Sequence, residues 1–310
     1  MKIFLCLALA SLFIVPPVFA QTSGFSVTPL FQEITLENEP AETFTVEIEN
    51  NTVALTTFSV AVLDFGNLDE SGGVAFQGAD KDLSQKYALA SWMRPETDTI
   101  NLEPGKKEVL TVTIENREDL SPGGHYAGLV FRSTADPGES AGDKGIAINQ
   151  VFSVLVFVKK LGGERYGLEY VGNEWEHSLW NLPEKPKLRF QNTGNVHVVP
   201  RGVISVTDPF GREIRRGVMN EESGLLLPES YRFFPTLLKS LAPALIPGRY
   251  TMTLWYRYDG KDDFTMREEK FDFLPLPAIL GSLILIAVVG WYVAKRRRNT
   301  GESGLPTDTA

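Results

Sequence analysis

Apolar and polar residues alternate along most of the chain between its two ends. The alternation is clear at 44–49 (FTVEIE), 57–62 (TFSVAV) and 109–115 (VLTVTIE). A period of two places successive side chains on opposite faces of a strand, so each segment predicts a half-buried β-strand. Turn-forming clusters such as 38–40 (NEP) and 122–124 (PGG) separate the strands. Since no stretch before the C-terminal apolar run has convincing helical periodicity, the pattern predicts an all-β ectodomain of the sandwich type.

The N-terminal end breaks this pattern with a continuous apolar run. Lys2 precedes apolar residues at 3–15, and small residues follow up to Ala20. This order predicts a signal peptide at 1–20 that is cleaved after Ala20, since a run of this length is too short to span a bilayer. The only cysteine, Cys6, lies inside this segment. The mature chain therefore has no thiol, which excludes disulfides, thiolate catalysis and cysteine-ligated metals.

The C-terminal end carries a longer apolar run, at 274–294, with no charged residue. Its 21 residues are enough for a transmembrane helix, and the basic tail at 295–310 marks the cytoplasmic side. The sequence thus predicts a type I single-pass protein of the cell membrane, with the ectodomain extracellular or periplasmic. The residues expected to anchor the span are Trp291, Tyr292, Lys295, Arg296, Arg297 and Arg298.

Two alternatives for this end remain open. A buried core helix has a similar composition, although four consecutive cations would not end one. A Pro-containing segment at 276–278 (LPA), the apolar run and the arginines together resemble an exosortase-type sorting signal, but the chain continues beyond the basic cluster. The segment LPTDT at 305–309 follows the span, where a sortase motif would precede it.

The charge balance limits the class of partner. Residues 21–273 carry 25 of the 30 Lys and Arg residues, because Lys2 and four cations at 295–298 lie outside, and 37 of the 39 Asp and Glu residues. The predicted ectodomain therefore has a net charge near −12. Such a surface argues against nucleic acid and against anionic lipid headgroups.

An internal repeat predicts the number of domains. Pro104 and Pro122 match Pro228 and Pro247 at offsets of 124 and 125 residues, within LEPG/LPES and PGGHY/PGRY. Matches further upstream have offsets of 141 and 144 residues, and the excess corresponds to a polar, Gly-rich insertion at 67–86. One module used twice explains both offsets. The predicted domains are two tandem immunoglobulin-like β-sandwiches, at 24–160 and 166–273.

The segment PGGHYAGLVF at 122–131 raises the question of a binding loop. An anion-binding glycine loop would open a helix, whereas an alternating strand follows here, and the second copy has Arg249 in place of His125. We therefore interpret the glycines as a turn and the tyrosine as packing at the start of the strand, like the tyrosine corner of immunoglobulin-type sandwiches. The predicted turn and corner residues are Pro122, Gly123, Gly124, Tyr126, Pro247, Gly248 and Tyr250.

Several segments resemble the bacterial WxL-interacting proteins, and more broadly bacterial membrane-anchored proteins with tandem immunoglobulin-like domains. The segments are FSVTP (25–29), LASW (89–92), LEPG (102–105), PGGHYAGLVF (122–131) and NTGNVHVVPRGVISVTDPFGREI (192–214), with the terminal span and basic tail. The resemblance implies a first domain associated with peptidoglycan and a second associated with a surface protein partner. Where that family often has Gly-Gly-Ile, this chain has Ala127-Gly128-Leu129, so no binding residue is transferred.

Residues that carry chemistry are sparse. His125, His177 and His197 have no second histidine at metal-site spacing, and the nearest cluster is 174–177 (EWEH). No nucleophile motif occurs, so the sequence predicts a protein that is not an enzyme and has no metal and no cofactor. Acidic loops at 68–73, 79–82 and 136–144 have oxygens suited to calcium, but not the EF-hand spacing, and solvated loops are the simpler interpretation.

Two apolar features are candidates for contact surfaces, although core packing is the simpler reading. One runs from Phe233 to Ile246, and the other comprises Trp255, Tyr256 and Tyr258. Together these patterns predict a non-catalytic, membrane-anchored bacterial surface protein that links the membrane to the cell wall or to a partner protein. The alternative is a chaperone-like assembly factor for extracellular subunits that acts by β-strand addition, which would need an exposed edge strand.

Overall fold

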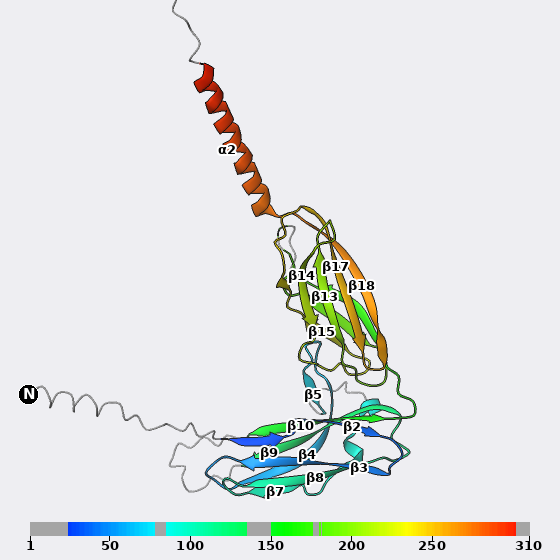
Figure 1. Ribbon diagram of the computed structural model, residues 1–310. Helices are drawn as coiled ribbons and strands as arrows, with labels where there is room; N and C mark the ends of the chain where they lie inside the picture. The colour runs from blue at the N-terminus through cyan, green and yellow to red at the C-terminus, as the bar shows by residue number, and fades with distance from the viewer. Residues whose placement is uncertain (1–23, 78–84, 135–149, 176–179, 181, 302–310) are drawn as a thin grey trace, which may run out of the picture. The chain divides into compact units, whose positions relative to one another are not determined.

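The computed structural model describes residues 24–77, 85–134, 150–175, 180 and 182–301, and the predicted signal peptide lies outside them. The described chain is mostly β-strand with one C-terminal apolar helix, as predicted (Figure 1). It forms two compact units. Unit 1 holds residues up to Asp64, Leu89–Leu120 and Ala127–Phe157, and unit 2 holds Phe65–Ala88, Ser121–Tyr126 and residues from Val158 onward.

Two sheets build the first half of the chain. One has the order β1 (Phe25–Thr28), β3 (Ala41–Asn50), β8 (Lys107–Glu115), β6 (Met93–Pro95). The other has the order β2 (Phe31–Leu36), β10 (Val151–Lys160), β9 (Gly123–Thr134), β4 (Thr56–Asn67), β5 (Val74–Phe76), with β7 (Thr99–Leu102) also paired to β4. Two short 3₁₀ turns, η2 (Gln85–Tyr87) and η3 (Ala90–Trp92), lie between β5 and β6.

The predicted alternation explains how these two sheets pack. Phe44, Val46 and Ile48 of β3 are buried, while their neighbours along the strand are more exposed. From the other sheet Phe58 of β4 reaches Phe25 of β1, and their rings meet edge to face with centroids 4.7 Å apart. The apolar faces of the two sheets are therefore joined in one sandwich core.

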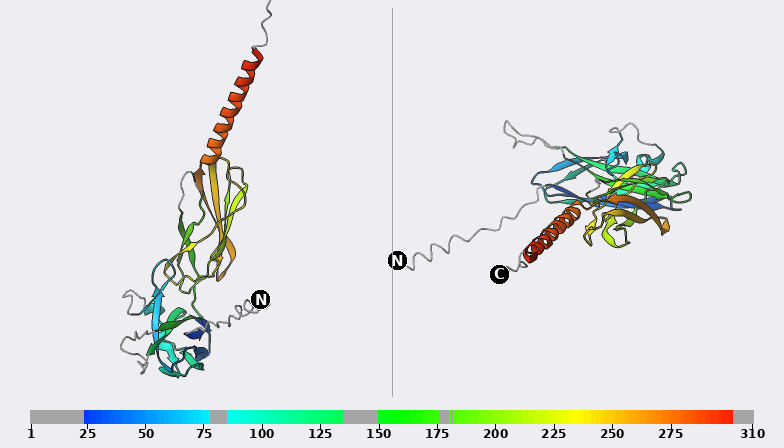
Figure 2. Two further views of the ribbon diagram at one scale, coloured as in Figure 1. Left: turned by 90° about the vertical axis from the view of Figure 1, so that its left-hand side faces the viewer. Right: turned by 90° about the horizontal axis from the view of Figure 1, so that it is seen from above.

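Unit 2 contains a second pair of sheets, which the two further views show from other sides (Figure 2). The smaller has the order β11 (Leu168–Glu174), β12 (Lys187–Asn192), β15 (Tyr231–Pro235). The larger has the order β16 (Lys239–Ser240), β14 (Glu213–Met219), β13 (Arg201–Thr207), β17 (Gly248–Tyr258), β18 (Lys261–Phe273). Phe190 of β12 packs on Phe234 of β15 and on Tyr256 of β17, at centroid distances of 5.9 and 5.0 Å, so the core lies between the sheets.

The segment expected as an insertion at 67–86 contributes to unit 2. It begins at the end of β4, turns, and returns as the short strand β5. At the turn the Glu70 carboxylate accepts two hydrogen bonds from the Arg189 guanidinium of β12, of 2.7 and 2.6 Å. The Glu70 carbonyl also accepts a 2.8 Å bond from the Phe233 amide of β15. The compact units thus do not coincide with contiguous ranges, because the chain passes between them five times.

The helix α2 (Leu276–Gly301) begins three residues after β18 ends. Within it, 20 residues from Ala278 to Arg297 are long and apolar enough to cross a membrane, by length and composition. Trp291 and Tyr292 are exposed on its surface, and the Lys295 ammonium lies 5.1 Å from the centre of the Trp291 ring. The helix continues through Arg296, Arg297 and Arg298.

Candidate functional site

The solvent face of the five-stranded sheet of unit 2 carries a row of apolar side chains. In register, Val218 of β14 lies opposite Val203 of β13, Val203 opposite Trp255 of β17, and Trp255 opposite Met266 of β18. Phe264 lies two residues before Met266 on the same face of β18. The apolar row is the name used here for these five residues, Val203, Val218, Trp255, Phe264 and Met266. Val218, Met266 and Phe264 are about half exposed, at 49%, 51% and 57%. An apolar set of this kind on the solvent face of a sheet suits a protein contact.

The apolar row ends at a strand edge. β18 is the outer strand of its sheet, and among the described residues no other strand pairs with its second edge. The strand is 13 residues long, so it offers a row of backbone donors and acceptors beside Phe264 and Met266. Charged residues along β18 limit pairing with arbitrary strands, and Glu269 adds an inward-pointing carboxylate.

Burial and the neighbouring Glu269 carboxylate raise the pKa of the Tyr170 hydroxyl, which donates a 2.7 Å hydrogen bond to Glu269 and remains neutral.

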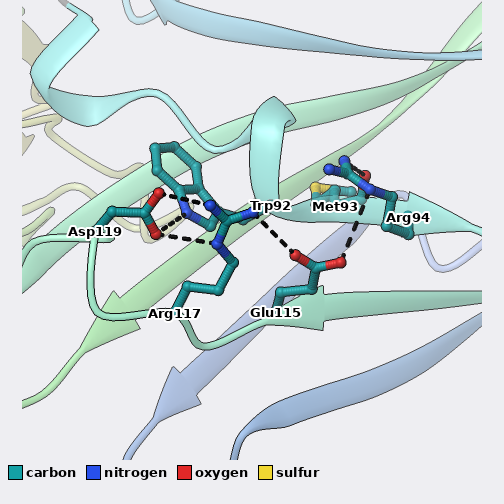
Figure 3. Close-up of polar contacts among 6 residues, drawn as sticks. All are labelled: Trp92, Met93, Arg94, Glu115, Arg117 and Asp119. Atoms are coloured by element: carbon teal, nitrogen blue, oxygen red, sulfur yellow. Dashed lines mark hydrogen bonds and ion pairs between the residues drawn. The ribbon is translucent and has the colours of Figure 1, made fainter.

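A cluster of polar side chains lies in unit 1, between η3, β6 and the end of β8 (Figure 3). The Trp92 indole N–H donates to Asp119 Oδ1 at 3.1 Å. The Arg117 guanidinium donates to both oxygens of the same carboxylate, at 3.1 and 2.9 Å. Glu115 lies between two cations, 3.6 Å from Arg117 Nη1 and 3.8 Å from Arg94 Nε, and Arg94 also donates to the Met93 carbonyl at 2.9 Å.

This cluster is electrostatic rather than catalytic. The Trp92 N–H and the Arg117 guanidinium lower the pKa of the Asp119 carboxyl, because both stabilise its ionised form. A general acid requires the opposite shift, and none of the six residues in the cluster is a serine, cysteine or histidine. Because the charged groups are about half exposed, each pair contributes little to stability. The arrangement fastens the η3–β6 segment to the turn after β8.

The predicted turn residues lie in unit 2, where they make a close main-chain contact. β9 begins at Gly123, whose φ of +126° favours glycine, and a Cβ there would lie 2.9 Å from the Asn195 carbonyl oxygen. The next amide, of Gly124, donates to that carbonyl at 2.8 Å. The segment that begins at Pro122 is therefore packed on the loop that carries Asn195. The sequence did not indicate this contact, because it depends on residues about 70 positions apart.

The two tyrosines that follow these turns are both buried but bond differently. Tyr250 follows Pro247 and Gly248 (φ +145°), and its hydroxyl donates a 2.7 Å bond to the Ile246 carbonyl four residues upstream. That is the geometry of a tyrosine corner. The Tyr126 hydroxyl instead lies 3.3 Å from His197 Nδ1.

The histidines take structural positions where they are described. His125 is buried, with Nδ1 2.9 Å from the Ala88 carbonyl and Nε2 2.7 Å from the Ser121 carbonyl. His177 lies outside the described residues, and so do the acidic loops at 79–82 and 136–144. In the loop at 68–73, Asp69 accepts bonds from Ser71. Within the described parts of the chain, no group of three or more His, Cys, Asp or Glu residues is placed to hold a metal ion.

The two predicted apolar features divide between core and surface. Tyr256 is buried and Tyr258 packs against the core, while Trp255 faces outward in the apolar row. Between Phe233 and Ile246, Phe234 and Leu238 are buried. The exposed leucines of that segment are Leu237, Leu241 and Leu245. The sequence thus identified the features, and the structure separates their inward from their outward residues.

Comparison with known proteins gives similarity of structure only. No family model matches the chain, and no curated protein matches it. A chain of the chaperone–tip adhesin complex of CFA/I fimbriae is similar with a TM-score of 0.41 and 9% identity, over 81% of this chain and 99% of that one. The class 5 fimbriae chaperone CfaA is similar with a TM-score of 0.41 and 8% sequence identity, over 79% of this chain and 99% of that one. A chain of the CsuC–CsuE pre-assembly complex of Acinetobacter baumannii has a TM-score of 0.39 and 11% sequence identity, over 79% of this chain and 97% of that one. At these TM-scores the similarity carries no argument about function.

Proposed function

We propose that the chain is a non-catalytic, membrane-anchored bacterial surface protein that holds a partner protein close to the membrane. In this proposal the ectodomain comprises two tandem immunoglobulin-like sandwiches and α2 is the span of a type I protein. The observation that carries the proposal is the apolar row of unit 2 beside the unpaired edge of β18. The resemblance of the turn and strand motifs to the WxL-interacting proteins is consistent with this function.

The partner that fits this surface is an extended segment of another protein. Backbone groups along the edge of β18 supply hydrogen bonds to an added strand, and Phe264 and Met266 supply apolar contacts at alternate positions. The span α2 would keep this surface at the membrane, which raises the effective concentration of any second contact. A weak contact of another part of the ectodomain with peptidoglycan would then be sufficient to link membrane and wall.

The second candidate function is chaperone-like assembly of extracellular subunits by strand addition. The same unpaired edge of β18 favours it, because strand addition needs an edge of several residues that is not already paired. The two functions differ in the lifetime of the complex. A scaffold keeps its partner, whereas an assembly factor releases it once the partner has paired with another subunit.

The test uses the full chain in cells, with a photo-crosslinking amino acid placed at single positions of β18. Crosslinks at Phe264 and Met266, and their loss in Trp255→Ala, are expected if the apolar row binds a partner. The matched control is Val53, which is 91% exposed in unit 1. Equal crosslinking at Val53, or none at β18, would overturn the proposal. A pulse-chase of the crosslinked species separates a persistent scaffold from a partner that is released.

The contact with peptidoglycan needs its own measurement. The full chain, in detergent, is spun with purified sacculi, and the pellet is compared with that of a variant in which Met266 and Phe264 are serine. Saturable pelleting of both forms would place wall binding elsewhere than on the apolar row. If neither form pellets at physiological salt, the link to the wall is refuted and the protein partner alone remains.

A further inference from the structure

The end of unit 2 that leads into α2 contains a cleft of about 1320 Å³. Its lining includes Trp175, Trp180, Leu245 and Phe273, together with Pro275 and Ala278 at the start of the helix. Covalent connection alone keeps this cleft beside the span, because Phe273 lies three residues before the helix begins. If α2 crosses the bilayer as proposed above, the cleft opens at the level of the lipid headgroups.

The composition of the cleft differs from that of the acidic ectodomain. Three cations line it, Lys185, Lys187 and Arg215, against two carboxylates, Glu174 and Glu184. Neither lysine has an ion-pair partner among the described residues. Arg215 makes only a loose pair with Glu184, at 3.8 Å. The cations therefore retain the capacity to bind an anion.

Arg215 supports this reading through its own position. Its side chain is only 17% exposed, and its buried Nε has no acceptor within the described part of the chain. A guanidinium has five N–H donors in a fixed fork, which matches the geometry of a phosphate. An under-satisfied arginine in a cleft is thus suited to an anionic ligand brought to it from outside.

The apolar part of the lining suits the remainder of a lipid. Trp180 is 44% exposed and Leu245 is 58% exposed, and Leu241 on the same loop is also exposed. Tryptophan beside lysine and arginine is the composition of protein segments that lie at a membrane interface. The cleft is larger than the roughly 300–1,000 Å³ of small-molecule pockets, which leaves room for a headgroup and the start of its acyl chains.

We infer that this cleft binds the phosphate headgroup of an anionic phospholipid in the leaflet that faces the ectodomain. Lys185, Lys187 and Arg215 would contact the phosphate, and Trp180 and Leu245 would contact the glycerol and upper acyl carbons. The net charge near −12 predicted from the sequence argues against anionic lipid for the ectodomain as a whole. The local surplus of cations makes this end the exception. The inference rests on the proposed membrane anchoring.

The test uses the full mature chain in lipid nanodiscs that contain phosphatidylglycerol and phosphatidylcholine. Since the only cysteine, Cys6, is in the predicted signal peptide, Leu245→Cys gives a single site for an environment-sensitive fluorophore. Val53→Cys is the control label. We expect the label at 245, and not at 53, to shift to the blue and to be quenched by lipids that carry a nitroxide near the headgroup. Quenching should be stronger with nitroxide-labelled phosphatidylglycerol than with phosphatidylcholine.

Charge variants then test the headgroup contact. Lys185→Gln and Lys187→Gln should each reduce the preference for phosphatidylglycerol about fivefold, as expected for a cation at an anionic surface. The matched controls Lys106→Gln and Lys270→Gln remove exposed lysines outside the cleft and should leave the preference unchanged.

The outcomes separate this inference from the anchoring on which it rests. If the chain stays in the nanodisc but the label at 245 remains in water, the lipid site is refuted and the anchoring stands. Equal quenching by both lipids, unaffected by the lysine variants, also refutes the headgroup contact. A chain that is not retained by lipid refutes both. If soluble glycerol phosphate gives the same response in detergent, the site binds free phosphate and not lipid.

Discussion

The hydroxyl of Tyr250 gives a direct test of how the start of β17 is held. Tyr250→Phe removes one 2.7 Å hydrogen bond to the Ile246 carbonyl and leaves the buried ring in place, with Phe273 at a centroid distance of 5.2 Å. A neutral hydrogen bond contributes a net ~0.5–1.5 kcal/mol. Ile246 is only partly buried, so water can reach its freed carbonyl and the larger penalty for an unsatisfied buried group does not apply. We therefore expect a loss of about 1–1.5 kcal/mol.

Urea unfolding of residues 21–273, the predicted ectodomain, measures this loss. With an m-value of about 2 kcal/mol/M, the midpoint should fall by ~0.5–0.8 M. Tyr250→Ala removes the ring as well and should cost about 3–5 kcal/mol. Tyr258→Phe is the control, because no hydrogen bond of its hydroxyl to another described residue is seen, and its midpoint should stay within ~0.25 M of the parent. If Tyr250→Phe behaves like this control, the bond to Ile246 does not stabilise the fold and the reasoning is wrong.

Three further predictions concern the contacts within unit 2. Glu70→Gln should lower the urea midpoint, and more so at low salt, because it removes the charge that Arg189 faces. The Lys86 ammonium lowers the pKa of Glu229, so the unfolded state binds more protons. The stabilisation by this pair is fully present above the ordinary carboxyl pKa and is lost as the pH falls through the lowered pKa of Glu229 in the folded state. Lys86→Gln should therefore flatten the dependence of the urea midpoint on pH below about 4.5. Gly123→Ala should cost about 2–4 kcal/mol in urea unfolding, since a positive φ and a main-chain clash add together.

Matched variants show whether these effects have the stated causes. Asp272→Asn breaks the Arg249–Asp272 pair, whose side chains are more than 60% exposed, and should change the midpoint little. Gly105→Ala adds a Cβ in open space at a milder left-handed φ of +68°, and should cost only about 1 kcal/mol. If Gly105→Ala is as costly as Gly123→Ala, the contact with Asn195 contributes nothing. A pH profile of Lys86→Gln that matches the parent would contradict the role of Glu229.

The sequence predicts the strands well because alternation is a local property. The segments at 44–49, 57–62 and 109–115 all lie within the strands β3, β4 and β8. Local pattern also predicts a C-terminal helix, though its limits differ from 274–294. α2 starts at Leu276, where Pro277 is tolerated in a first turn, and continues to Gly301 because lysine and arginine favour helix.

Features that depend on distant residues could not be predicted in the same way. Alternation places Trp255 and Tyr256 on opposite faces, but only the position of β12 and β15 decides that Tyr256 faces the core. The insertion at 67–86 has the composition of a polar loop, and its place in unit 2 follows from contacts formed about 120 to 160 positions away, among them the ion pairs Glu70–Arg189 and Lys86–Glu229 and the main-chain bond from Phe233 to Glu70. The cleft beside α2 likewise draws on four segments that no local pattern connects.

The connection between β18 and α2 has a mechanical consequence. Only Leu274 and Pro275 separate the strand from the helix, so tension on α2 is applied directly to β18. The strand is paired with β17 through ten residue pairs, from Phe273 opposite Gly248 to Lys261 opposite Tyr258. A pull along the strand loads these pairs together in shear, whereas a sideways pull would open them one at a time, beginning at Phe273. If α2 is the membrane anchor proposed above, a load borne by the other strands of unit 2 would therefore be resisted by the whole ladder rather than by its last bond.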